Sequence, residues 1–248
     1  MTTQTDRLAG LLLSADAAWA VGDAHGTGDA GAVGAIRQDT PFDVPGLAAV
    51  LAVWPAVGHL VADGALRLHT PLSAYWDRHH PPAGTTAHQL LTRTGGAERP
   101  DAVLGDLVEH LTGRPVHAFA AEHVWRPLGM TRTRPTDGPD PVLRSTLDDL
   151  GRFLHHLCEP AGRPVPRPWI TDSLRIRTGE LAPARGLVWQ PVARHEHRHD
   201  LWYHADAAGP ALWIAPRERR WAALLTRTPA LREPFRALAF PGERDSRR

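Results

Sequence analysis

This sequence of 248 residues contains no lysine: its 28 basic residues of the lysine and arginine types are all arginine. Arginine stays protonated in proteins, so it cannot replace a lysine amine as a general base or as a Schiff-base nucleophile. The arginines are scattered along the chain and balanced by 27 acidic residues, for a net charge of +1. This balanced pattern predicts no nucleic-acid partner.

Cysteine occurs once, at Cys158, which excludes an intramolecular disulfide and a cysteine-cluster zinc site. It lies in an apolar helical pattern, so a buried and inert thiol is expected. Residues 1–13 contain only a short apolar run and make a poor signal peptide. No stretch is expected to supply the roughly 20 apolar residues of a membrane span. We therefore expect a cytoplasmic protein without a cofactor or a membrane partner, with a homodimer left open.

The order of the expected elements predicts an α+β protein. Residues 11–21 are expected to form a strand pair around Asp16, and residues 22–34 a glycine-rich loop. Apolar spacings of three and four predict a helix over 46–64 that Pro55 should bend. Further helices are expected at 86–91, 103–111 and 116–124, with a fifth capped by Ser145 and a last one at 230–239. Strands are expected at 186–192, 201–203, 211–215 and 221–226.

This order indicates one domain over residues 1–248. A helical part at about 46–160 is inserted between the N-terminal strands and a C-terminal antiparallel sheet at 185–240. The first strands are expected to complete that late sheet.

Several segments carry patterns that together point to one family. They are Leu60–Leu66 with Pro71–Tyr75, Thr86–Gly96, Leu111–Gly113 with Trp125–Thr133, Ser145–Leu154, and the last strands at Leu212–Pro216 and Leu225–Thr226. In this order, and over most of the chain, they resemble the serine β-lactamase, esterase and D-alanyl-D-alanine peptidase superfamily in its class C-like branch. The resemblance implies a β-lactamase/transpeptidase-like fold with a reduced helical subdomain.

The catalytic motifs of that family are degenerate in this chain. The family's chemistry needs a serine one helical turn before a lysine that takes its proton. Counting back from Gly64 places these two positions at Leu47 and Val50, both aliphatic. The Tyr-x-Asn motif falls at 96–98 and ends at Glu98, and the Lys/His-Thr/Ser-Gly motif falls at 204–206. The resemblance therefore implies a scaffold that is not a functional β-lactamase or D,D-peptidase.

His204 is the residue of the third motif that survives, and it is the main candidate for acid–base chemistry. Imidazole titrates near neutral pH, and Asp206, Asp43 or Glu98 could serve as its carboxylate partner. Residues i and i+2 of a strand share a face, so His204 and Asp206 could act together. The alternative interpretation is a packing histidine followed by a turn aspartate.

Nine tryptophans suggest an aromatic binding wall. The resemblance places six apolar or aromatic side chains near the cleft as candidate ligand-binding residues: Leu47, Val50, Trp54, Trp189, Trp202 and Tyr203. Such a wall would suit a small apolar or aromatic molecule. The alternative is that tryptophan only fills space in the core. The alternating histidines at 195–199 could hold a metal, but a solvated turn is favoured and no metal site is predicted.

Three functions remain open at this stage. The favoured one is a non-hydrolytic catalyst that binds a small molecule and steers a cyclisation, isomerisation or elimination in a biosynthetic pathway, because orientation alone can lower a barrier. The second is a catalytically dead relative that binds a ligand or a partner protein. The third is a hydrolase with a relocated nucleophile at Ser145, Ser173 or Cys158.

Overall fold

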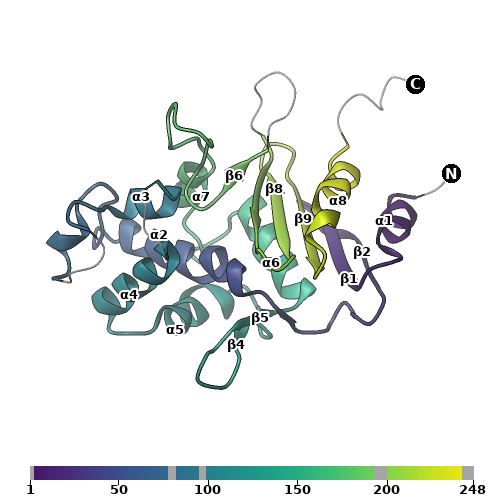
Figure 1. Cartoon of the computed structure of the whole chain (residues 1–248), viewed down its shortest axis with the longest axis horizontal. Coiled ribbons are helices and arrows are strands. Elements are labelled where there is room, and N and C mark those ends of the chain that lie inside the picture. Colours follow the sequence, from purple (N-terminus) through teal and green to yellow (C-terminus); the bar gives the residue numbers. More distant parts are fainter. Residues whose placement is uncertain (1–2, 78–81, 95–98, 193–199, 242–248) are drawn as a thin grey trace. The chain divides into compact units, whose positions relative to one another are not determined.

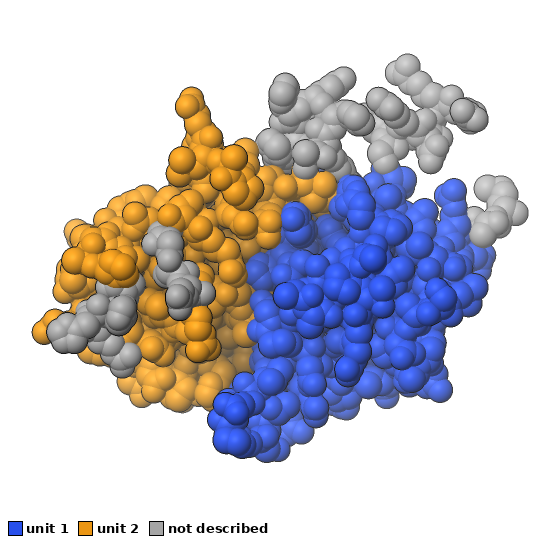
Figure 2. Space-filling model, viewed as in Figure 1, with its two compact units in different colours: residues 1–47, 129–159, 203–248 blue, residues 48–128, 160–202 orange. Residues whose placement is uncertain are grey.

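The computed structural model describes residues 3–77, 82–94, 99–192 and 200–241. The chain divides into two compact units, shown in blue and orange in Figure 2. Unit 1 comprises residues 1–47, 129–159 and 203–248, and unit 2 comprises residues 48–128 and 160–202. Helices and antiparallel strands both occur, so the predicted α+β class is confirmed. The expectation of one domain with an inserted helical part stays a prediction.

The main sheet of unit 1 contains strands from both ends of the chain (Figure 1). Strand β1 (Ala17–Asp23) pairs antiparallel with β2 (Gly26–Val33) on one side and with β9 (Arg220–Thr226) on the other, and β9 pairs with β8 (Ala211–Ala215). The expectation that the first strand completes the late sheet is therefore confirmed. The strands run in the order β2 (Gly26–Val33), β1 (Ala17–Asp23), β9 (Arg220–Thr226), β8 (Ala211–Ala215), β7 (Trp202–Ala205).

Both faces of this sheet are covered, and the register shows how. Trp213 of β8 lies opposite Ala222 and contacts Phe235 of helix α8 (Arg232–Ala239), with ring centroids 5.5 Å apart. Trp221, the residue of β9 before Ala222, points to the other face and packs on Gly151 of helix α6 (Leu147–Cys158). The helices of unit 1 are α1 (Gln4–Leu12), α6 (Leu147–Cys158) and α8 (Arg232–Ala239). A small second sheet has the order β3 (Phe42–Asp43), β5 (Leu143–Ser145), β4 (Arg134–Pro135).

Two predictions at the N-terminus were wrong. Residues 11–13 were expected in a strand, but residues 11 and 12 are the last of helix α1 and Leu13 is its C-cap. The helix begins with a capping box at Thr3. A short apolar run does not distinguish helix from strand, which explains the error. The expected glycine-rich loop is instead strand β2. Gly31 lies opposite Trp19, whose indole occupies the space of a side chain there, since an added Cβ would lie 2.2 Å from the ring.

Unit 2 is mainly helical, and the helices predicted at 86–91, 103–111 and 116–124 are confirmed. The side chain of Thr86 caps the first of these through Gln89. Helix α7 was missed, and of the strand predicted at 186–192 only two residues are strand. The elements are η2 (Ala49–Val53), α2 (Trp54–Ala62), η3 (Leu72–Ala74), α3 (Ala87–Thr92), α4 (Pro100–Thr112), α5 (Val116–Ala120), η4 (Ala121–Trp125), α7 (Arg167–Ser173) and β6 (Gln190–Pro191).

The bend expected at Pro55 takes the form of a π-helical turn, η2, directly before α2. Proline has no amide hydrogen to donate to the carbonyl four residues earlier, which belongs to Leu51. The indole Nε1 of Trp125 donates to that carbonyl instead, at 2.8 Å. The side chain thus restores the hydrogen bond that the proline removes.

One helical stretch, Pro45–Ala62, is long and apolar enough to cross a membrane by length and composition. The sequence-based expectation that no stretch approaches this length was therefore wrong. In the structure 67% of this stretch is buried, which is typical of the core helix of a soluble fold. The cytoplasmic location stays a prediction.

Candidate functional site

His204 and Asp206, the predicted acid–base pair, meet at the main chain of Gly46 in unit 1. The Nε2 atom of His204 lies 3.0 Å from the Gly46 carbonyl oxygen, to which it can donate a hydrogen bond. One carboxylate oxygen of Asp206 accepts from the Gly46 amide at 2.7 Å, and the other accepts from the Ala208 amide at 2.9 Å. His204 is only 4% exposed and Asp206 only 3% exposed. Both polar groups are thus occupied by main-chain partners.

Gly46 is a glycine because Asp206 approaches it so closely. An added Cβ would lie 2.9 Å from the carboxyl carbon of Asp206. The loop after Asp206 is held as well, since the Arg232 guanidinium donates to the carbonyl oxygens of Asp206 and Gly209. Burial lowers the pKa of Arg232, and the nearby Asp206 offsets part of this effect. We call the contacts of His204 and Asp206 with Gly46 the Gly46 clamp.

The positions that resemble the family's serine and lysine carry no polar side chain and no exposed surface. Leu47 follows Gly46 in unit 1 and is completely buried. Val50 lies in the π-helical turn of unit 2 and is also completely buried. Neither side chain can give or take a proton. The third predicted carboxylate, Glu98, lies outside the described residues.

The predicted tryptophan wall is in part a buried cluster within unit 2. The rings of Trp54 and Trp189 meet edge to face, with centroids 6.0 Å apart. Trp169, which the sequence did not single out, packs against Trp54 and donates its indole hydrogen to the Trp54 carbonyl oxygen at 3.0 Å. Trp54 and Trp189 are fully buried, Trp202 is nearly so, and Tyr203 is half-buried. Space filling in the core accounts for the cluster, and a ligand-binding role stays a prediction.

Trp169 packs against a glycine of helix α2, and no periodic sequence pattern predicts this position. It follows three prolines within six residues and starts no apolar repeat. Its ring lies on Gly58 of α2, where an added Cβ would be 2.4 Å away. The only sequence signal was therefore a glycine inside a helix, which often marks a close packing partner.

Ser145 is a buried hydrogen-bond donor and not the helix cap that was predicted. Its hydroxyl oxygen lies 2.8 Å from that of Thr133, whose own hydrogen goes to Asp149 at 2.7 Å, so Ser145 is the donor to Thr133. The cap of α6 is the next residue, Thr146, which accepts from the Asp149 amide. Burial raises the pKa of Asp149, and its hydrogen bonds partly offset the effect.

Ser173 is equally enclosed. It is completely buried in unit 2, and its hydroxyl oxygen accepts the indole hydrogen of Trp54 at 2.8 Å. A serine nucleophile needs a base within hydrogen-bond reach and a substrate in front of it. The contacts described for Ser145 and Ser173 supply neither.

Cys158 is expected to be inert towards thiol reagents in the native protein. Its thiol donates to the Arg220 carbonyl oxygen at 3.5 Å, and burial raises its pKa to about 12. Because the thiolate is the reactive form, Ellman's reagent at pH 8 should label no thiol in the folded protein and one thiol in urea. Rapid stoichiometric labelling without urea would contradict this prediction.

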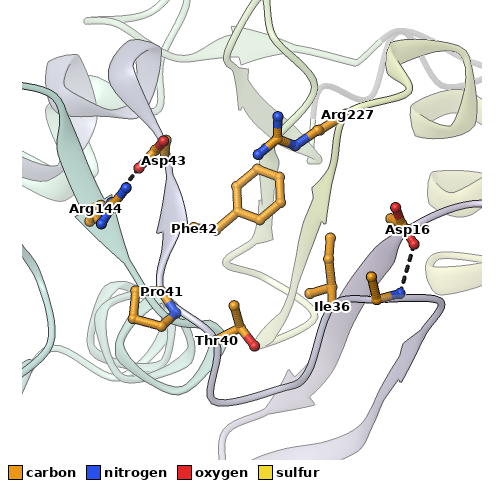
Figure 3. Close-up of a pocket in the computed structure, with 9 residues that line it drawn as sticks. Asp16, Ile36, Thr40, Pro41, Phe42, Asp43, Arg144 and Arg227 are labelled. Carbon is orange, nitrogen blue, oxygen red and sulfur yellow. Dashed lines mark hydrogen bonds and ion pairs between the residues drawn. The ribbon is translucent and has the colours of Figure 1, made fainter.

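A pocket with a volume of about 410 Å³ opens on unit 1 (Figure 3). Asp43, a predicted catalytic carboxylate, lies here and forms an ion pair with Arg144 at 2.5 Å, both side chains about half exposed. The other charged residues of the pocket, Asp16, Arg144 and Arg227, were not predicted as site residues. The lining residues are Asp16, Ala35, Ile36, Thr40, Pro41, Phe42, Asp43, Arg144 and Arg227.

Within the residues that the structure describes, no three or more histidine, cysteine, aspartate or glutamate side chains are grouped to hold a metal ion. The histidine run at 195–199 lies outside those residues. The absence of a metal site therefore stays a prediction.

Comparison with known proteins identifies the fold. A family model described as beta-lactamase matches residues 9–240. Similar solved structures include a beta-lactamase from Mycobacterium bovis (22% identity, 96% of this chain and 99% of that chain, TM-score 0.74). A second is the D-alanine carboxypeptidase AmpC from Burkholderia cenocepacia (17% identity, 95% of this chain and 97% of that chain, TM-score 0.74). A third is simvastatin synthase from Aspergillus terreus (12% identity, 95% of this chain and 93% of that chain, TM-score 0.76). These identities show the fold alone. A comparison with curated protein sequences gives no match.

Proposed function

We propose that this chain, which belongs to the beta-lactamase family, carries out no acyl transfer and acts by binding a small molecule. The observation that carries the proposal is the Gly46 clamp. The histidine and the carboxylate at the third motif are buried and hydrogen-bonded to the main chain. A general acid or base must instead reach the proton that it transfers in a bound substrate. His204 and Asp206 serve as structural groups.

The loss of the hydrolytic machinery supports the same proposal. The chain contains no lysine and no asparagine, so neither the serine–lysine pair nor the Tyr-x-Asn motif can be supplied from another position. The relocated nucleophiles considered from the sequence, Ser145, Ser173 and Cys158, are all buried. A non-hydrolytic catalyst, favoured from the sequence, takes second place because His204 and Asp206 have almost no exposed surface.

Two reagents test the absence of acyl transfer. A fluorophosphonate probe should label no serine, and a chromogenic cephalosporin should stay intact, with an active class C β-lactamase as the positive control. Labelling that disappears in Ser145→Ala or Ser173→Ala would identify a working nucleophile and refute the proposal.

A binding role and a catalytic role differ in the fate of the ligand. Any small molecule that raises the melting temperature does so by binding the folded state. Prolonged incubation with the protein should return that molecule unchanged by mass spectrometry. Its conversion to an isomer, or to an elimination product, would favour the catalytic alternative.

A further inference from the structure

The charges around the pocket of unit 1 are of both signs. Asp43 and Arg144 pair with each other. Asp16 and Arg227 are both exposed, and neither has an ion-pair partner among the described residues. Figure 3 shows these two side chains on different sides of the pocket, with Phe42 and Ile36 between them and the Asp43–Arg144 pair. The pocket therefore offers one cation and one anion separately to a ligand.

The cation is positioned by an aromatic ring. The guanidinium carbon of Arg227 lies 5.7 Å from the centroid of the Phe42 ring, within the range of a cation–π contact. Phe42 is 7% exposed and Ile36 is 8% exposed, so their side chains form the apolar floor below this group. A guanidinium over such a floor can pair with a carboxylate through two parallel hydrogen bonds.

The anion is positioned by the backbone of the chain. One carboxylate oxygen of Asp16 accepts from the Ala35 amide at 2.7 Å. Gly34 has a φ of +73°, and an added Cβ would lie 2.1 Å from that same oxygen, so glycine leaves room for the carboxylate. The second oxygen has no hydrogen-bond partner among the described residues and is available to a ligand.

We propose that this pocket binds a zwitterionic amino acid with an apolar side chain. Arg227 pairs with its carboxylate, Asp16 with its ammonium group, and Ile36 and Phe42 contact its side chain. Asp16 disfavours a simple anion and Arg227 disfavours a simple amine, so both charges are needed. The volume of about 410 Å³ lies within the range of roughly 300–1,000 Å³ for small-molecule pockets. This inference rests on the proposed binding role and names the ligand class and the place.

Three probes of similar size separate the contribution of the ammonium group from that of the carboxylate. L-Phenylalanine carries both charges, 3-phenylpropionate lacks the ammonium group, and phenethylamine lacks the carboxylate. Titration followed by isothermal calorimetry and ligand-observed NMR should show phenylalanine binding at least about tenfold more tightly than either analogue, since each lost charge-assisted hydrogen bond costs at least that factor. Failure of phenylalanine to bind at millimolar concentration, or equal binding of either analogue, would overturn the inference.

Two variants locate the binding. In Arg227→Gln, phenylalanine and phenethylamine should bind equally, because the partner of the carboxylate is gone. In Asp16→Asn, phenylalanine and 3-phenylpropionate should bind equally, while the amide oxygen keeps the contact with Ala35. Arg7→Gln, an exposed arginine of α1, is the matched control and should bind as the wild type does. Unchanged phenylalanine affinity in Arg227→Gln would place binding elsewhere. Serine labelling would refute the proposed function by a separate measurement.

Discussion

Val50→Lys is expected to destabilise the protein by about 4–5 kcal/mol and to restore no hydrolysis. Position 50 is where the family's lysine falls, and its side chain is completely buried in unit 2. Burial disfavours the charged ammonium and can depress a lysine pKa by roughly 3–5 units, which corresponds to about 4–5 kcal/mol at pH 7, because a lysine whose pKa falls below 7 is already neutral at that pH. Total stabilities are about 5–15 kcal/mol, so this cost removes a large part of the stability of the folded state. Urea unfolding monitored by circular dichroism measures the change.

Val50→Met separates the effect of charge from that of size. Methionine is a long, flexible and neutral side chain, so overpacking should cost roughly 1–3 kcal/mol. The combined variant Leu47→Ser, Val50→Lys should be inert towards the chromogenic cephalosporin even where it folds, because the other motifs are missing. A Val50→Lys protein as stable as Val50→Met would show that position 50 reaches water.

Asp206→Ala is expected to destabilise the protein by roughly 3 kcal/mol or more. The carboxylate accepts hydrogen bonds from the Gly46 and Ala208 amides, and hydrogen bonds to charged groups contribute about 1.5–3 kcal/mol each. Alanine also leaves the Gly46 amide without this partner. The midpoint of urea unfolding should fall while the slope stays the same.

Asp148→Ala is the matched control for this substitution. Asp148 also lies in unit 1, but its side chain is 71% exposed and forms a surface ion pair with Arg152 at 3.0 Å. Exposed pairs contribute about 0.2–1 kcal/mol. Equal destabilisation by Asp206→Ala and Asp148→Ala would contradict a structural role for Asp206 and reopen its catalytic role.

Elements with strong local signals were predictable from the sequence. Strand β8 was predicted and found at 211–215, an apolar run between Gly209-Pro210 and Pro216. Helix α3 was predicted at 86–91, and the capping box of Thr86 and Gln89 that starts it is a local hydrogen-bond pattern. Such elements depend on neighbours within a few residues, and those neighbours are visible in the sequence.

The parts that depend on distant residues were not predictable. His204 and Asp206 were expected to act together as neighbours on a strand, yet β7 ends before Asp206. Gly46, the residue that unites them, lies 158 and 160 residues away in the chain. Strand β2 was mistaken for a loop because it is rich in glycine. The indole that fills the space beside Gly31 belongs to Trp19 of strand β1. His204 and Asp206 could therefore be singled out from the sequence, whereas their shared partner Gly46 could not.

The pairing of β1 with β9 has a consequence for how the chain folds as a ribosome produces it. β1 ends at residue 23, and its partner β9 ends at residue 226. The β1–β2 hairpin can form early, but an isolated hairpin is only marginally stable. All residues of unit 2 are made by position 202, before β8 and β9 exist. The second edge of β1 therefore stays unpaired until residues 220–226 have left the ribosome.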